Sequence, residues 1–304
     1  MARLAILSDV HGNVPALEAV LADLDAQRPD EVLVGGDLVG RGPQGSRVTE
    51  IIRRRGWRTI KGNHEDYLLN FRRGDIPEAW NHLDVWAAAR WMSAELNDDD
   101  VAFLSDLPAE VRSTSLPEVL LVHGTPRSNR KGIGPWTSTS SMSRHLESIR
   151  GSVLVCAHTH RPLERRLDVG RIINAGSVGL PFNRDPRAQY VVLHGDGAAG
   201  SETIETEFRR VDYDRAEILA IYERSGFLAE GGVTARLLEL EIHHAAPFLV
   251  PFLTWSSVHG VPQVPDSIPG FLRNYDPDHQ REFWAELGVV PRSEPTGTGD
   301  REGS

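Results

Sequence analysis

Five short apolar runs in the sequence are each followed by polar side chains that could bind metal ions. The side chains offered are histidine, aspartate and asparagine, a mixture of imidazole, carboxylate and amide groups that suits borderline divalent ions such as Mn, Fe, Zn, Co or Ni. One such histidine alone is more often a structural residue, but five places in one chain predict a metal centre. They are Asp9-Val10-His11, Gly36-Asp37, Gly62-Asn63-His64, His123-Gly124 and His158-Thr159-His160.

The spacing within these places favours two metal ions rather than one. Where a strand runs into its loop, alternate side chains face the same way, so Asp9 and His11 can point to one site, and so can His158 and His160. The two oxygens of Asp37 can bridge a pair of ions and hold them roughly 3.5–4 Å apart. Four or five imidazoles argue against Ca or Mg, which prefer oxygen ligands. We therefore expect two divalent ions.

The elements that must position these side chains alternate between strands and helices. Strand-like runs over Arg3–Ser8, Glu31–Val34 and Trp57–Ile60 are separated by helical spacing over Pro15–Ala26 and Thr49–Arg55. This alternation predicts an α/β sheet with parallel neighbours. Ligands of such sheets bind at the carboxyl ends of the strands, which is where the polar residues fall.

The rest of the chain extends this pattern into three predicted parts. Strands are expected at Val119–Val122 and Val153–Cys156, a helix over Ala79–Leu96, and a second, more antiparallel sheet from Leu163 to Glu207. We predict a catalytic domain over residues 1–242. Residues 243–290 are Pro-rich and aromatic without a sustained period, and form an extension of unknown role packed on the domain. Residues 291–304 are polar and Gly-rich, which predicts a disordered tail.

Composition limits the compartment and the partners. The 304 residues carry 33 Lys and Arg against 43 Asp and Glu, a net charge of −10, which argues against an extended nucleic-acid partner. The lone Cys156 excludes an internal disulfide framework. We expect no signal peptide and no membrane span, because the longest apolar stretch, Ala245–Trp255, contains two prolines. These features predict a cytoplasmic protein and leave a homo-oligomer open.

The five places together resemble the motifs of the calcineurin-like metallophosphoesterase superfamily. The likeness covers about Arg3 to Val211, with Ala157 standing where the family has glycine, and nothing after about His243 is similar. The final His-x-His favours the bacterial phosphodiesterase branch. The five motifs are Ser8-Asp9-Val10-His11-Gly12-Asn13, Gly36-Asp37-Leu38-Val39, Gly62-Asn63-His64-Glu65, Val122-His123-Gly124 and Ala157-His158-Thr159-His160. A further segment, Asn174-Ala175-Gly176-Ser177-Val178-Gly179, resembles the Asn-Pro-Gly-Ser segment of the bacterial branch.

This resemblance implies a fold, a ligand set and a reaction. The fold is a four-layer α/β/β/α sandwich of two mixed sheets flanked by helices, followed by the C-terminal extension. A hydroxide between the ions attacks phosphorus in line, and Asp37 bridges the ions. One ion is implied at Asp9, His11, Asp37 and His160, and the other at Asp37, Asn63, His123 and His158.

Three further residues complete the predicted site. His64, next to Asn63, orients the phosphate or protonates the leaving oxygen. Arg41 lies in a stretch similar to one in phosphoprotein phosphatases and diadenosine tetraphosphatases, where an arginine clamps phosphate, and its planar fork suits that task. Arg127 follows His123 in a basic loop that could recognise the leaving group; a solvated loop is an equal interpretation.

The expected function is therefore a metal-dependent hydrolase of small phosphate esters, with phosphodiesters as the leading substrate class. Arg41 supports an alternative on the same site, a protein or dinucleoside-polyphosphate phosphatase. A third reading is a non-catalytic metal-binding scaffold, and it ranks lowest because every ligand position carries a suitable side chain.

Overall fold

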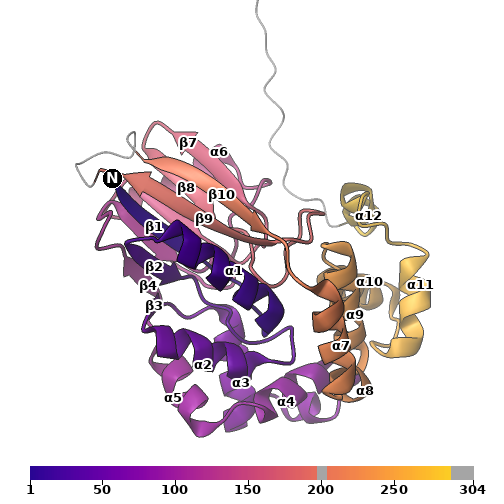
Figure 1. Ribbon diagram of the computed structural model, residues 1–304. Helices are drawn as coiled ribbons and strands as arrows, with labels where there is room; N and C mark the ends of the chain where they lie inside the picture. The colour runs from indigo at the N-terminus through magenta and orange to yellow at the C-terminus, as the bar shows by residue number, and fades with distance from the viewer. Residues whose placement is uncertain (197–203, 289–304) are drawn as a thin grey trace, which may run out of the picture.

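Two five-stranded sheets form the centre of the molecule in a computed structural model, which describes residues 1–196 and 204–288 (Figure 1). The first sheet contains β1 (Ala2–Leu7), β2 (Glu31–Val34), β3 (Arg58–Thr59), β9 (Ala188–Gly195) and β10 (Glu205–Val211). The second contains β4 (Glu110–Arg112), β5 (Val119–Val122), β6 (Val153–Cys156), β7 (Leu163–Leu167) and β8 (Gly170–Asn174). The strand orders are β10-β9-β1-β2-β3 and β4-β5-β6-β8-β7.

Both sheets mix parallel and antiparallel neighbours. In the first, β1, β2 and β3 run parallel to one another, while β9 is antiparallel to β1 and to β10. In the second, β5, β6 and β8 are parallel, and β4 and β7 pair antiparallel at the two edges. The carboxyl ends of the parallel strands lead into the loops that carry the predicted site, as expected for such sheets.

An apolar layer between the sheets holds them together. Along β1, Leu4 and Ile6 enter this layer, whereas Ala5 and Leu7 pack on the opposite face against helices. Because both faces are covered, the strand reads as a continuous apolar run. The buried residues of the layer are Leu4, Ile6, Leu33, Ile60, Val111, Leu116, Val119, Leu121, Val153, Val155, Ile173, Ala175, Val191, Leu193 and Ile204.

Helices cover the outer faces of both sheets, which confirms the predicted four-layer sandwich. The second sheet is covered by α6 (Thr139–Glu147), whose Met142 and Leu146 pack on Leu120 and Leu154. The helices packed on the first sheet and on one another are α1 (Val14–Gln27), α2 (Gly45–Arg55), α3 (Asn63–Arg73), α4 (Ala87–Ala94), α5 (Asp98–Asp106), α7 (Arg215–Arg224), α8 (Phe227–Glu230) and α9 (Gly232–His244).

The C-terminal region forms helices around its own aromatic cluster and lies to one side of the sandwich (Figure 1). The helices are α10 (Leu249–His259), α11 (Ile268–Leu272) and α12 (Gln280–Glu286). The predicted boundary at residue 242 falls in the last turn of α9, which packs on the domain through Leu238 and on the C-terminal cluster through Leu237. The predicted tail, residues 291–304, and residues 289–290 lie outside the described part.

Two predictions about the elements were wrong. The strands between Leu163 and Glu207 do not form one sheet, because β7 and β8 join the second sheet while β9 and β10 join the first. The helix expected over Ala79–Leu96 is broken into two short 3₁₀ turns, Glu78–Asn81 and Asp84–Trp86, followed by α4. Within the described residues, no helix is both long and apolar enough to cross a membrane.

Glu31, at the start of β2, joins the first sheet to the segment that follows β4 in the second. Its carboxylate accepts hydrogen bonds from the Ser113 and Ser115 hydroxyls and from the Thr114 and Ser115 amides, at 2.6–3.2 Å. Arg58 lies 3.3 Å from it. Burial would raise the pKa of Glu31, but these hydrogen bonds outweigh it and lower the pKa to about 2. The ionised carboxylate therefore stabilises the folded state.

We expect the substitution Glu31→Gln to destabilise the protein at pH 7 by about 1–3 kcal/mol, the usual contribution of hydrogen bonds to a charged group. Because the folded pKa is depressed, this stabilisation is complete above pH 4.5 and is lost as the pH falls toward 2. Urea denaturation of metal-free protein between pH 7 and pH 3 measures it. Glu18→Gln on α1 is the exposed control, and a difference from wild type that stayed constant over this pH range would contradict the prediction.

Candidate metal centre

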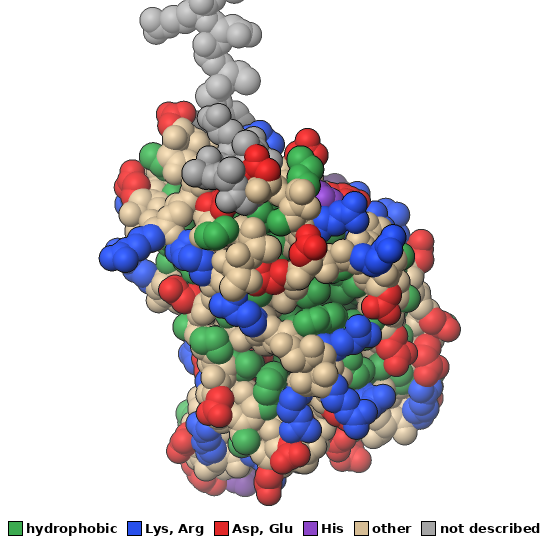
Figure 2. Space-filling view, turned by 60° about the vertical axis from the view of Figure 1, so that its left-hand side comes forward, with side chains coloured by type: hydrophobic (Ala, Val, Ile, Leu, Met, Phe, Trp, Pro, Cys, Tyr) green, Lys and Arg blue, Asp and Glu red, His purple; other side chains and the backbone are tan. Residues whose placement is uncertain are grey.

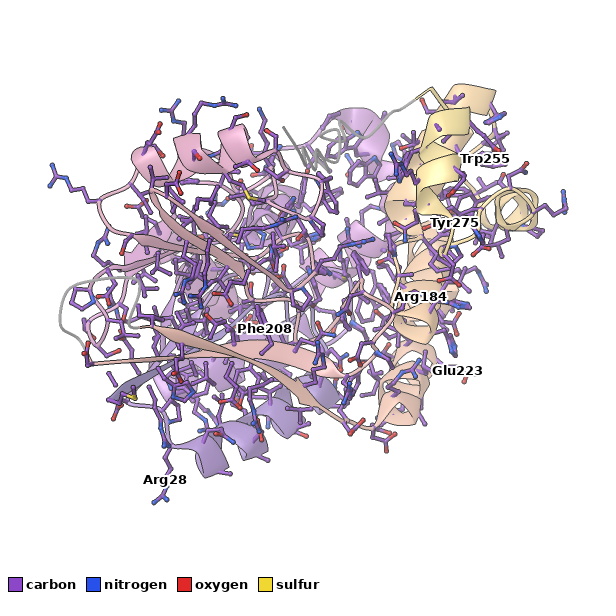
Figure 3. The ribbon with its side chains drawn as sticks, turned by 90° about the horizontal axis from the view of Figure 1, so that it is seen from above. Arg28, Arg184, Phe208, Glu223, Trp255 and Tyr275 are labelled. Atoms are coloured by element: carbon purple, nitrogen blue, oxygen red, sulfur yellow. The ribbon has the colours of Figure 1, made fainter. Side chains whose placement is uncertain are left out.

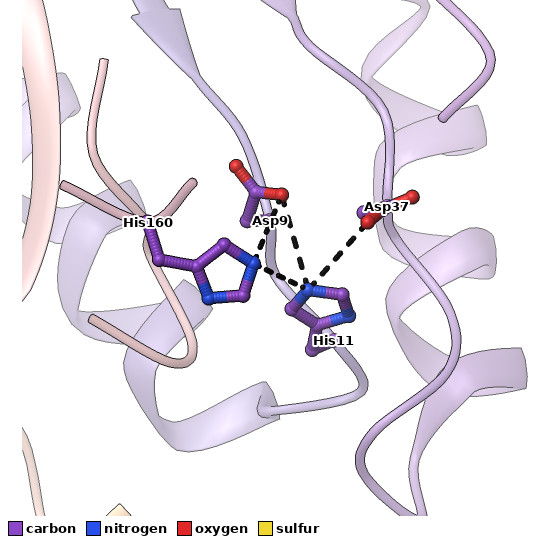
Figure 4. Close-up of side chains that lie close together, drawn as sticks. All are labelled: Asp9, His11, Asp37 and His160. Carbon is purple, nitrogen blue, oxygen red and sulfur yellow. Dashed lines mark hydrogen bonds and ion pairs between the residues drawn. The ribbon is translucent and has the colours of Figure 1, made fainter. Parts of the chain in front are cut away.

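The first group of candidate ligands combines loops from both sheets. Asp9 and His11 follow β1, Asp37 follows β2, and His160 follows β6. His160 Nε2 lies 3.3 Å from Asp9 Oδ1 and 3.1 Å from His11 Nε2. His11 Nε2 is 3.7 Å from Asp37 Oδ2, so the four side chains converge on one point (Figure 4).

A second group shares Asp37 with the first. His123, directly after β5, places Nε2 3.3 Å from Asp37 Oδ2, and His158 completes the group. The Oδ1 atom of Asn63 lies 3.1 Å from His123 Nε2 and 2.7 Å from His158 Nδ1. The structure thus brings all seven predicted ligands together, with one oxygen of Asp37 between the two groups.

The backbone of these loops adopts a conformation that side chains other than glycine seldom take. Five of the seven candidate ligands have φ between +51° and +67°. Such left-handed residues cost energy and persist where the surrounding structure holds them, which is common at functional sites. They are Asp9, His11, Asp37, His158 and His160.

Gly62 gives Asp37 the space it needs, because a Cβ at this position would lie 2.1 Å from Asp37 Oδ1. We expect Gly62→Ala to displace that carboxylate and to weaken metal binding by about 10–100-fold, the usual loss when a ligand loses its support. Calorimetric titration with Mn²⁺ measures this affinity. Gly270→Ala on α11 is the control, because its new Cβ would meet other atoms only at 3.4 Å or more. Equal Mn²⁺ affinities of both variants and wild type would show that Gly62 does not protect the ligand.

The hydrogen bonds around the imidazoles orient their inner nitrogens for a cation. His11 Nδ1 donates to the Val39 and Gly40 carbonyls, both at 3.2 Å, and His160 Nδ1 donates to Leu180 O at 2.6 Å. With the protons assigned to these nitrogens by their acceptors, both Nε2 atoms present lone pairs to each other at 3.1 Å. Two facing lone pairs repel unless a positive ion lies between them.

Other buried atoms also fit a metal. Asp9 Oδ1 is buried and accepts no hydrogen bond, although ionised oxygens in such places are normally satisfied. His123 Nδ1 donates to Gly35 O at 2.8 Å, which directs Nε2 toward Asp37. The nitrogen and oxygen donor set, held by backbone carbonyls, matches the surroundings of metal-bound histidines. The residues present therefore fit divalent metal ions.

The pKa shifts show where this site favours positive charge. Burial opposes a charged His123, but the carboxylates of Asp37 and Asp9 outweigh it and raise the pKa of His123 to about 10. Burial lowers the pKa of His158 to about 4, and the charge on His123 contributes. Burial also lowers the pKa of His11 well below its usual value. Positive charge is thus favoured between Asp37 and His123, where the two candidate ligand groups meet.

Glu65 supports the site, a role that the sequence analysis did not assign. Its buried carboxylate accepts the amide N–H groups of Asp37 at 2.9 Å, Leu38 at 2.7 Å and Gly62 at 2.7 Å. Burial and the nearby charge of Asp37 raise the pKa of Glu65 to about 7. The sequence did contain a signal for this role, because Glu65 is the third residue after the N-cap Gly62. A glutamate at that position often accepts hydrogen bonds from the amides at the start of a helix.

His64 and Arg41 lie at the edge of the ligand groups. The His64 amide donates to Asp37 Oδ1 at 2.9 Å, and its ring lies edge-on to His11 at 4.9 Å. Arg41 Nε donates to His64 Nε2 at 3.2 Å, and Arg41 Nη1 donates to Glu241 Oε2 at 2.8 Å. Burial lowers the pKa of His64 to about 3, against the opposing charge of Asp37, so the ring is neutral at pH 7.

Arg127 lies apart from this cluster. It is exposed and lines a pocket of about 430 Å³ together with Lys61 and the back of His123. Burial lowers the pKa of His145 on α6, and the charge of Arg127 adds to this shift. No contact between Arg127 and Asp37 or His64 is present among the described residues, so Arg127 is placed at the rim of the site.

The family profile described as calcineurin-like phosphoesterase matches residues 2–162, which is more than half of the chain. The protein therefore belongs to this family and is a metal-dependent phosphoesterase, as the motifs predicted. The match ends two residues after His160, so it includes every candidate ligand and excludes Glu241 and the C-terminal helices.

Solved structures and a named relative agree with this assignment. A metallophosphoesterase from Sphaerobacter thermophilus is 28% identical, with a TM-score of 0.60 over 75% of this chain and 99% of that one. The hypothetical protein PH1004 from Pyrococcus horikoshii is 22% identical, with a TM-score of 0.65 over 78% and 98%, and shows the shared fold. The symmetrical bis(5'-nucleosyl)-tetraphosphatase of Nitrosococcus oceani is 27% identical over 148 residues, 47% of this chain and 49% of that protein.

Proposed function

We propose that the protein is a dinuclear hydrolase of phosphate esters that prefers phosphodiesters. The observation that carries the proposal is the single oxygen, Asp37 Oδ2, that faces His11 in one ligand group and His123 in the other. A pair of divalent ions bound there supplies Lewis acidity and an activated water for in-line attack at phosphorus. Mn, Fe, Zn, Co and Ni all suit the donor set.

The chain's own residues position the substrate around that centre. Arg41 reaches the site from the loop after β2, and its planar guanidinium can bind two phosphate oxygens at once. His64 lies between Arg41 and Asp37 and orients the same phosphate. Asn63 holds the edge beside His123 and His158 and contacts both metal and substrate in this proposal.

Metal removal and reloading test the proposal. Protein stripped with a chelator should lose turnover of bis(p-nitrophenyl) phosphate, and one of the five ions should restore it at two ions per chain. Diester turnover above that of p-nitrophenyl phosphate supports the preferred substrate class. One ion per chain at full activity would contradict the dinuclear centre. If the protein neither bound metal nor hydrolysed either ester, only the scaffold interpretation would remain.

A dinucleoside-polyphosphate phosphatase is the second candidate. Arg41 beside His64 favours it, and so does the likeness to the tetraphosphatase of Nitrosococcus oceani. Hydrolysis of diadenosine tetraphosphate faster than of bis(p-nitrophenyl) phosphate by the metal-loaded protein would select this candidate. A protein phosphatase would instead show turnover of phosphopeptides.

On the face that Figure 2 shows, the mixture of charges favours small phosphate esters over extended nucleic acids as substrates. Lys and Arg side chains are interspersed with Asp and Glu over the face that Figure 2 shows. Nucleic-acid grooves usually carry a basic stripe. A cytoplasmic location and a homo-oligomer stay predictions from the sequence.

A further inference from the structure

Glu241 is a fully buried carboxylate on the apolar face of α9. It follows Leu237 by four residues and Leu238 by three, so it shares the face on which these leucines are buried. A buried carboxylate is costly unless charged or hydrogen-bonding partners satisfy it. The partners of Glu241 therefore show what it does.

Each oxygen of this carboxylate has a different partner. Oε2 accepts from Arg41 Nη1 at 2.8 Å, and the two side chains are 0% and 14% exposed. Oε1 accepts the amides of Phe248 at 2.8 Å and Leu249 at 2.9 Å, where α10 begins. Glu241 thus ties the candidate site to the start of the C-terminal helices.

Arg41 is held on several sides. Its Nε donates to His64, its carbonyl accepts from the Tyr222 hydroxyl at 2.5 Å, and its guanidinium carbon lies 5.8 Å from the Phe182 ring centre. Among the described residues these contacts engage two of the five guanidinium N–H groups, which leaves donors for a phosphate. The contact with Glu241 is the one that supplies an opposite charge.

We propose that Glu241 is a positioning residue that holds Arg41 ready to grip the phosphate of the substrate, an inference that rests on the proposed function. A free arginine side chain must be ordered when substrate binds, and that cost weakens binding. The buried ion pair with Glu241 removes this cost in advance. The start of α10 then supports the substrate site through Glu241, although both lie outside the family match.

Further contacts join the same loops to the C-terminal region. Arg184, which follows the Phe182 segment, donates to His244 O at 2.9 Å and pairs with Asp278 at 2.9 Å. Figure 3 shows Arg184 beside the C-terminal helices. Arg161, next to His160, donates to Gln280 at 3.0 Å. Two loops near the site therefore contact this region directly, and Glu241 on α9 links a third, the Arg41 loop, to it.

The test compares Glu241→Gln with Arg41→Ala and with the double variant. Glutamine keeps an oxygen for the Phe248 and Leu249 amides but places an uncharged group beside Arg41. We expect KM for bis(p-nitrophenyl) phosphate to rise about 10-fold, since charged hydrogen bonds of this kind change binding by that order, with kcat changed much less. In the Arg41→Ala background, Glu241→Gln should have no further effect on KM.

Binding of inorganic phosphate to the Mn²⁺-loaded protein, measured by calorimetry, gives a readout that needs no turnover. Affinity should fall about 10-fold in Glu241→Gln and stay at the wild-type value in Glu223→Gln, an exposed glutamate on α7. If wild type binds phosphate but hydrolyses no ester, the proposed function fails while this inference is still tested.

A merely structural role predicts different results. The loss of phosphate affinity would then persist in the Arg41→Ala background. If Glu241→Gln does not fold, Glu241→Asp keeps the charge but cannot span both Arg41 and the α10 amides, so phosphate affinity should fall several-fold. Wild-type phosphate affinity in a folded variant, or an effect that persists without Arg41, overturns the proposal.

Discussion

Asp37→Asn should empty the metal centre and lower turnover of bis(p-nitrophenyl) phosphate by at least about 10³-fold, because metal ions supply several kcal/mol of transition-state stabilisation. Asp37 Oδ2 lies 3.3 Å from His123 Nε2 and 3.7 Å from His11 Nε2, so one oxygen serves both ligand groups. Asparagine has the same shape and can still accept the His64 amide. It lacks the negative charge that two ions would share.

Metal content by mass spectrometry and steady-state turnover measure this prediction together. Asp25→Asn, an exposed substitution on α1, controls for the general effect of losing a carboxylate. Circular dichroism should show that Asp37→Asn still folds, since the apolar layer between the sheets does not include Asp37. Two ions per chain with wild-type turnover in this variant would exclude Asp37 as the bridge.

The candidate ligands could be predicted from the sequence because each lies within four residues of the end of a strand. Where a strand ends, the next few side chains have little freedom of position, so short local motifs predict where they lie. The same logic failed for β9 and β10, because no feature of their own sequences distinguishes one sheet from the other. Their place depends on the pairing of β9 with β1, a contact between residues nearly 190 positions apart, and β10 then pairs with β9.

A tertiary contact explains the broken helix before α4. Asp84 Oδ2 accepts the Val233 amide at 2.7 Å, and Val85 O accepts from the Thr234 hydroxyl at 2.6 Å. These bonds satisfy the start of α9 and take up a carbonyl that a continuous helix would use. Helical spacing near Ala87 could not reveal a partner almost 150 residues later.

The sequence pattern around Glu241 predicts that this residue has a buried partner but does not identify that partner. A charged residue on the apolar face of a predicted helix is a signal of a buried partner. The sequence contains many arginines, and nothing local identifies Arg41 as that partner. The C-terminal helices were hidden for another reason, since they are short and α10 exposes Val250 and Val258, which obscures the helical period of its apolar residues.

The candidate centre exists only where the two sheets meet. The loops after β1, β2 and β3 supply four ligands, and loops after β5 and β6 supply three. The apolar layer that joins the sheets therefore also sets the distances within each ligand group, because each group combines loops from both sheets. A mutation deep in this layer should lower metal affinity as well as stability, in contrast to one under α6, where Leu146 packs outside the layer.

His64→Ala should lower kcat by about 10²–10⁴-fold while both metal ions stay bound, the range typical of a side chain that acts on the reacting group. His64 contacts Asp37 through its backbone amide, which alanine keeps, so the ligand itself is undisturbed. In the structure, His64 Nε2 accepts a hydrogen bond from Arg41. This arrangement favours a role in which the neutral ring orients the phosphate. It argues against a role in which the ring donates a proton from Nε2.

Substrates with different leaving groups separate these two roles. An orienting ring predicts the same loss for a p-nitrophenyl diester and for an alkyl diester, whose leaving oxygen needs a proton far more. A much larger loss on the alkyl diester would instead assign proton donation to His64. His82→Ala, an exposed histidine beside Glu78, is the matched control. Loss of metal in step with turnover would show that His64 supports the ligands, because catalysis would then fail before any phosphate is oriented.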